Sequence, residues 1–133
     1  MSQPAELVAM VGTRRRIPAV LASITTTLEG MDRETIVVTG AAPGTALHVK
    51  RECKRLGFRF IECHARWDHK GPAAGPERNT IIARLAQRVY AWPASPNDTP
   101  ENRKLSAGTW NCVEQFASRG KTTVVMDDAW RTG

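Results

Sequence analysis

The amino-acid sequence predicts an α/β protein, with one domain built on a five-stranded, mainly parallel sheet and helices on both faces. Five short apolar segments alternate with segments of helical periodicity along the chain. Strict alternation of this kind is typical of a parallel sheet covered by helices. The chain has 133 residues, a usual length for one domain rather than two. We therefore expect a single domain over residues 1–133, with its core at about 7–127.

The first half of the chain shows three strands and two helices. Strands are expected at residues 7–11, 35–39 and 58–63, where apolar and β-branched residues run together. The first helix has an apolar stripe of Ile17, Leu21, Ile24 and Leu28 and ends before Gly30. The second helix has a stripe of Ala46, Val49, Cys53 and Leu56 and is capped by Gly57.

The second half of the chain is richer in loops. Residues 65–76 contain several glycines and prolines and are predicted to form a loop. A helix is expected at 77–85 with Ile81, Ile82 and Leu85 inward, and another at 109–118 with Val113, Phe116 and Ala117 inward. Strands are expected at 89–92 and 122–126. We expect a polar, mobile loop at 93–107 and a tail at 127–133.

The composition narrows the class of protein. The chain has 19 Lys and Arg against 13 Asp and Glu, a net charge of +6, which favours anionic partners. No apolar stretch is long enough to span a membrane, and the N-terminus does not resemble a secretory signal. The three cysteines lack paired spacing, so we expect reduced thiols, a cytoplasmic location and no metal site. We also expect no resident cofactor.

The candidate site lies at the carboxyl ends of the predicted strands, where open parallel sheets bind their ligands. Glycine lets a backbone approach a ligand closely, and the start of a helix offers free N–H groups to a phosphate. Arginine adds a charged donor fork. The candidate ligand-binding residues are Gly12, Thr13, Arg14, Gly40, Gly44, Thr45, Trp67, Lys70, Arg78, Asn79, Gly108 and Thr109.

Several of these residue types also have ordinary structural roles. Trp67 is suited to stacking on a base, but it could equally cover the edge of the sheet. Thr109 taken singly is a typical helix cap, and Cys112 one turn later is interpreted as a packing residue. Lys50, Arg51, Lys54 and Arg55 form a basic helix face, which we interpret as solvated surface, with a nucleic-acid patch as the alternative. The strong phosphate motifs of ATPases and of dinucleotide dehydrogenases are missing from the sequence.

Four segments of the chain resemble the SLOG superfamily, and specifically its YspA-like branch, whose relatives include the LOG phosphoribohydrolases and DprA. These segments are Val11–Arg14, Val37–Gly40 with Gly44, Ala65–Asn79, and Gly108–Thr109. The resemblance implies a Rossmann-like fold, a nucleotide or nucleotide-derived ligand, and a homo-oligomer. It also implies that Gly108 and Thr109 bind phosphate and that Arg78 corresponds to the active-site arginine of the LOG enzymes. Cys112 stands where those enzymes have a catalytic glutamate, which puts hydrolysis in doubt.

Three functions therefore remain in order of preference. The first is a sensor or binding module that holds a nucleotide-derived ligand at the carboxyl edge of the sheet. The second is an N-glycosidic hydrolase, for which Asp68, Glu77, Glu114 and Asp128 are the acidic candidates. The third is a DNA-binding protein related to DprA, supported by the net charge of +6.

Overall fold

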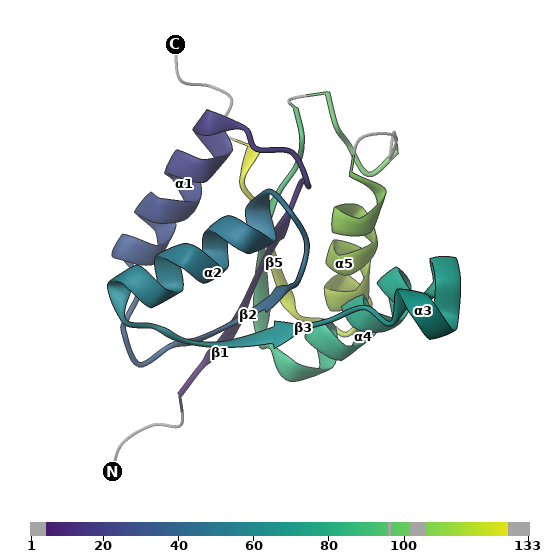
Figure 1. Ribbon diagram of the computed structural model, residues 1–133, viewed down its shortest axis with the longest axis horizontal. Helices are drawn as coiled ribbons and strands as arrows, with labels where there is room; N and C mark the ends of the chain where they lie inside the picture. Colours follow the sequence, from purple (N-terminus) through teal and green to yellow (C-terminus); the bar gives the residue numbers. More distant parts are fainter. Residues whose placement is uncertain (1–4, 96, 102–105, 128–133) are drawn as a thin grey trace.

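The computed structural model describes residues 5–95, 97–101 and 106–127, and within them five strands form one sheet. The strands are β1 (Leu7–Gly12), β2 (Ile36–Gly40), β3 (Arg59–Cys63), β4 (Arg88–Trp92) and β5 (Thr122–Val125). They lie in the order β3-β2-β1-β4-β5, and all neighbours pair in parallel. The predicted fold class is confirmed, since helices cover both faces of this sheet (Figure 1).

Two apolar clusters hold the helices to the two faces. On one face α1 (Pro18–Glu29) and α2 (Thr45–Leu56) pack over Met10 and Val37. On the other face α4 (Ala74–Leu85) and α5 (Ala107–Ser118) pack over Ala9 and Val38. Neighbouring residues of one strand thus enter opposite clusters, as the period of two in a strand requires. Both faces of the central strands are therefore buried.

Residues 65–76, predicted as a loop, fold into short helical turns, so that prediction is wrong. The segment forms α3 (Trp67–Lys70) and a 3-10 turn (Gly71–Ala73), and α4 begins at Ala74 rather than at residue 77. The prolines misled the prediction, because proline fits the first turn of a helix, where its missing N–H is not needed. Pro72 and Pro76 both occupy such first turns.

Two of the predicted inward faces are rotated. On α4, Ile81 and Leu85 are exposed at 44% and 40%, and only Ile82 of the predicted three is buried. The buried face instead includes the polar Asn79, which bonds to α5. On α5, Ala117 is exposed and Val113 is half-buried, while Phe116 is buried as predicted. The buried face there also includes Thr109, Trp110 and Cys112.

A buried carboxylate organises the described part of the predicted loop 93–107. Asp98 is 4% exposed and accepts hydrogen bonds from the indole Nε1 of Trp110 at 2.8 Å and from the backbone N of Ala94 at 2.8 Å. These bonds tie the segment to α5. Residues 96 and 102–105 of that loop, and residues 128–133 of the predicted tail, lie outside the described residues, so Asp128 cannot be placed.

Two further findings concern the cysteines and the helices. Cys53, Cys63 and Cys112 are all free and buried. None of the described helices is long and apolar enough to cross a membrane.

Candidate functional site

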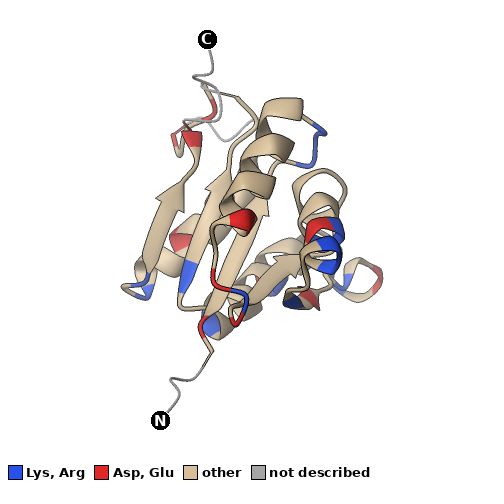
Figure 2. Cartoon of the chain, turned by 90° about the vertical axis from the view of Figure 1, so that its left-hand side faces the viewer, with Lys and Arg blue, Asp and Glu red and all other residues tan. Residues whose placement is uncertain are grey.

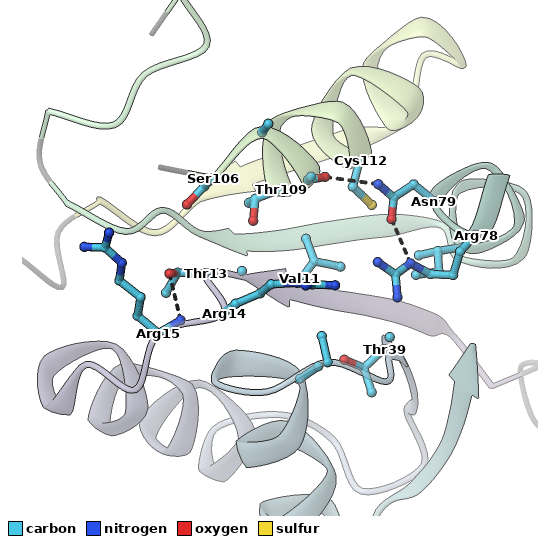
Figure 3. A pocket seen from close by; sticks show the side chains of 17 residues that line it. Val11, Thr13, Arg14, Arg15, Thr39, Arg78, Asn79, Ser106, Thr109 and Cys112 are labelled. Carbon is cyan, nitrogen blue, oxygen red and sulfur yellow. Dashed lines mark hydrogen bonds between the residues drawn. The ribbon is translucent and has the colours of Figure 1, made fainter. Parts of the chain in front are cut away.

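A cavity of about 230 Å³ opens at the carboxyl edge of the sheet, between the ends of β1 and β2 and the helices α4 and α5 (Figure 3). Eight of the twelve predicted site residues line it, namely Gly12, Thr13, Arg14, Gly40, Arg78, Asn79, Gly108 and Thr109. The other lining residues are Val11, Arg15, Thr39, Ala42, Ala46, Ile82, Ser106, Ala107 and Cys112. The topology thus brings segments that are nearly a hundred residues apart into one pocket.

The loop after β1 is fixed by backbone contacts with its neighbours. The backbone N of Thr13 donates to the carbonyl of Trp92 at 2.9 Å, and the backbone N of Thr45 donates to the carbonyl of Thr13 at 3.0 Å. Gly44 has φ +76°, and a Cβ there would lie 2.4 Å from the carbonyl of Arg14, so only glycine fits. Gly44 and Thr45 therefore support the pocket without lining it.

Arg78 is a partly buried cation without a carboxylate partner among the described residues. Its Nε donates to Oδ1 of Asn79 at 3.0 Å, and its guanidinium lies against Gly40, where a Cβ would be 2.6 Å from Nη1. Burial lowers the pKa of Arg78, and the positive charge of Arg14 acts in the same direction. Because an unpaired buried cation is costly, this site favours an anion.

Asn79 joins this arginine to the start of α5. Its Nδ2 donates to the carbonyl of Gly108 at 3.1 Å and to Oδ1 of Asn111 at 3.0 Å, while its Oδ1 accepts from Arg78. All three of these polar functions are thus engaged within the protein. Asn79 lines the pocket, but its geometry suits it to holding Arg78 and α5 in place.

The start of α5 provides unpaired donors to the same cavity. Ser106 is the N-cap residue, yet its side chain makes no capping bond. The residue is 6% exposed, and its Oγ has no hydrogen-bond partner among the described residues. The first N–H groups of a helix are free and lie at the positive end of its dipole. Ser106, Gly108 and Thr109 therefore present hydrogen-bond donors to the cavity.

Trp67 and Lys70 do not line the cavity. Trp67 is 47% exposed and rests against Gly75, and its ring centroid lies 5.7 Å from Cζ of Arg14. This distance is typical of a cation–π contact. Lys70 instead pairs with Glu77 at 3.7 Å, and Arg66 binds the same carboxylate. Trp67 thus lies beside a pocket residue, whereas Lys70 belongs to a surface ion-pair group.

Sequence reasoning did not select Arg15, Thr39, Ser106 or Cys112 as site residues. Arg15 was overlooked in favour of its neighbour, and Ser106 has only its position before Gly108 to indicate a role. The hydroxyl of Thr39 donates a hydrogen bond to the backbone carbonyl of Met10 at 2.9 Å. Burial raises the pKa of the Cys112 thiol to about 12, so it is neutral at physiological pH and a poor nucleophile.

No Asp or Glu is among the described residues that line the cavity. Glu77 pairs with Arg66 and Lys70, and Asp68 and Glu114 are exposed. The pocket wall instead combines three arginines with hydroxyl groups and the apolar side chains of Val11 and Ile82. Such a wall can hold an anion, but it offers no carboxylate for acid or base chemistry.

The strand order and the pocket define an α/β Rossmann-like protein, with a candidate site where the chain returns to place β4 beside β1. The structure is similar to that of DNA processing protein A (DprA) from Streptococcus pneumoniae, with a TM-score of 0.73 and 19% sequence identity. The similarity covers 96% of this chain and 54% of the DprA chain. The chain thus spans about half the length of that protein, and the likeness establishes the fold. Neither a family model nor a curated protein matches the sequence.

Proposed function

We propose that the protein binds a nucleotide or nucleotide-derived ligand in this pocket, as a sensor or ligand-binding module. The observation behind the proposal is the partly buried Arg78, which has no carboxylate partner in the described part of the chain and faces a cavity without acidic lining. Arginine binds phosphate oxygens at two points, and these charged hydrogen bonds are stronger where water is excluded. An anionic ligand would supply the missing counter-charge.

Other features of the pocket support a nucleotide over a simple inorganic anion. Val11 and Ile82 give one part of the wall an apolar surface suited to a sugar or base. Trp67 lies beside Arg14 at the same edge and is exposed enough to stack on a base. The donors at the start of α5 fit a phosphate.

Hydrolysis of the ligand ranks below simple binding. Cleavage of an N-glycosidic bond needs an acid or base near the ribose. The described candidates Asp68, Glu77 and Glu114 are not among the lining residues. A binding function requires only the groups that the pocket has.

The test is calorimetric titration of adenosine nucleotides into the wild type and two arginine variants. Arg78→Ala should weaken phosphate binding by about 1.5–3 kcal/mol, as expected for a charged hydrogen bond. Arg84→Ala is the matched control, because Arg84 is an exposed residue on the same helix, outside the pocket lining. Equal affinities in the wild type and Arg78→Ala, or no nucleotide binding by the wild type, would refute the proposal.

Nucleic-acid binding is the second candidate, and two observations favour it. The fold is similar to that of a DNA processing protein, and α2 has an exposed basic face that includes Arg51 and Lys54 (Figure 2). If single-stranded DNA binds this face, its affinity should fall steeply with salt, and Arg51→Gln should reduce the salt slope by about 1. Nucleotide affinity should stay unchanged in that variant.

The finer family assignment is part of the same proposal. We infer that the chain belongs to the YspA-like branch of the SLOG superfamily and acts in the cytoplasm. Support comes from the positions of the resembling segments, since Val11–Arg14, Gly40, Arg78–Asn79 and Gly108–Thr109 all contribute to the pocket.

A further inference from the structure

We propose that the ligand has two separate anionic groups, one bound by Arg14 and Arg78 and the other bound at the start of α5. This inference rests on the proposed nucleotide-binding function. It identifies the ligand class as a nucleoside with phosphoryl groups at two positions, rather than a simple monophosphate. We call the two parts of the pocket the arginine end (Arg14 and Arg78) and the helix end (Ser106, Gly108 and Thr109).

The arginine end concentrates positive charge at one place. Arg14 and Arg78 both line the cavity and are close enough for the charge of Arg14 to lower the pKa of Arg78. Within the described residues neither side chain pairs with a carboxylate. Two guanidinium groups that repel each other favour an anion of more than one charge between them.

The helix end is an independent anion site, because it uses different groups. The hydroxyl of Ser106 is buried, faces the cavity and lacks a hydrogen-bond partner in the described structure. A buried hydroxyl without a partner is uncommon, and Thr45 has another, but only that of Ser106 belongs to a residue that lines the cavity. The free N–H groups at the start of the 12-residue helix α5 lie next to it. Together they form a cradle of donors for an oxyanion.

Within the helix end, Ser106 is the residue that lies farthest from Arg78. Ser106, Thr109 and Cys112 follow one another at intervals of three residues along α5, and Cys112 is the residue close enough to interact electrostatically with Arg78. Six residues correspond to ~9 Å along a helix axis. Figure 3 shows Ser106 and Arg78 at opposite ends of the pocket, with Thr109 and Cys112 between them.

The experiment compares three probes in calorimetric titrations at constant ionic strength: adenosine 5′-monophosphate, adenosine 5′-diphosphate and adenosine 3′,5′-bisphosphate. For the wild type we expect the bisphosphate to bind about tenfold or more tightly than the monophosphate. Arg78→Gln and Ser106→Ala should each weaken the bisphosphate, by about tenfold and several-fold respectively. For the monophosphate, Arg78→Gln should lower the affinity and Ser106→Ala should not, because its single phosphate occupies the arginine end. Arg84→Gln is the control and should change neither affinity.

A second measurement separates a binding role of Ser106 from a structural one. Removing a hydroxyl that has no partner should leave the melting temperature of the free protein unchanged or raise it, although the bisphosphate binds more weakly. A lower melting temperature of Ser106→Ala would show that the hydroxyl stabilises the fold, and would contradict its assignment to the ligand.

The possible failures can be told apart. If the monophosphate and the bisphosphate bind the wild type equally, or if both variants weaken the monophosphate, the two-anion inference is wrong while the proposed function stands. A gain for the 5′-diphosphate without one for the bisphosphate would also overturn the separation of the two ends. If none of the three nucleotides binds the folded protein, the proposed function and this inference both fail.

Discussion

Two arginines of this protein, Arg78 in the pocket and Arg55 on α2, have opposite surroundings. Arg55 is 53% exposed along its side chain and binds Glu52 through Nε at 2.7 Å and Nη2 at 2.9 Å. Arg78 lies against Gly40 and bonds to the neutral amide of Asn79, without a carboxylate partner in the described structure. The fold thus gives Arg55 a carboxylate partner, whereas the charge of Arg78 is left for a bound anion to pair.

The difference shows why net charge alone is a poor guide to the site. The excess of basic residues includes surface cations that are already paired, such as Arg59 with Glu34 at 3.9 Å. Exposed pairs of this kind contribute little to stability or binding. A partly buried cation without a counter-charge is a more informative feature, because burial makes its missing partner costly. The predictions below test whether Arg78 and Arg55 really differ in this way.

The largest effect is expected from Asn79, which orients Arg78 and the start of α5. Asn79→Ala should reduce nucleotide affinity at least tenfold, and should cost about 1–3 kcal/mol of unfolding free energy by leaving buried groups unpaired. Titration calorimetry and denaturant unfolding measure the two quantities. An unchanged affinity would show that Asn79 does not determine the orientation of Arg78 for binding.

Asn79→Asp makes this test sharper, because it should separate affinity from stability. The new carboxylate would lie beside Arg78 and supply the counter-charge that the ligand otherwise provides. Its second oxygen would face the carbonyl of Gly108 and Oδ1 of Asn111, to which Nδ2 now donates. We therefore expect Asn79→Asp to be no more stable than Asn79→Ala, and to bind the nucleotide more weakly. The reverse order of affinities would argue that the ligand does not pair with Arg78.

A medium effect is expected from Gly40, which leaves room for the guanidinium. In Gly40→Ala the new methyl would meet Nη1 of Arg78, the far end of a flexible side chain, at 2.6 Å. Affinity should fall several-fold, while stability falls by about 1 kcal/mol or less.

The matched variant Gly12→Ala should show the opposite balance of effects. Its methyl would lie 2.8 Å from the carbonyl of Trp92 and 2.7 Å from Oγ1 of Thr45. Because a backbone atom cannot turn aside, we expect a loss of about 1–3 kcal/mol in stability. Similar stability losses in the two glycine variants would contradict a displaceable guanidinium at Gly40.

The sequence was sufficient to predict most of the fold. The five strands appear near their expected positions. Strands and helices could be predicted because buried residues recur with the period of each element. The errors come from tertiary contacts that override local pattern. Ile81 was expected inward for its apolarity, but Asn79 takes an inward position because α5 offers it two hydrogen-bond partners. A prediction from the spacing of apolar residues does not place a polar residue such as Asn79 in the core.

Predicting the residues that line the pocket was harder, although a pocket does lie at the carboxyl ends of the strands. The topology rule located the lining glycines and Arg78 without knowledge of side-chain directions. It could not distinguish the role of Gly44, which supports the loop after β1, from that of Gly40, which lies against Arg78. Nor could it identify Ser106, whose importance lies in the missing hydrogen bond of a buried hydroxyl. That property exists only in three dimensions.

The smallest effect concerns Arg55 and its partner. Bonds from Arg55 and Thr25 lower the pKa of Glu52 to about 2. A lowered pKa stabilises the fold above the ordinary carboxyl pKa, and this contribution is lost as the pH falls toward 2. Glu52→Gln should therefore lower the melting temperature by about 2–4 °C at pH 7, and the gap should close in acid. Nucleotide affinity should not change, because the pair lies outside the pocket lining. A weakened affinity would show that the cations of α2 also serve the ligand, and the contrast between Arg55 and Arg78 would no longer hold.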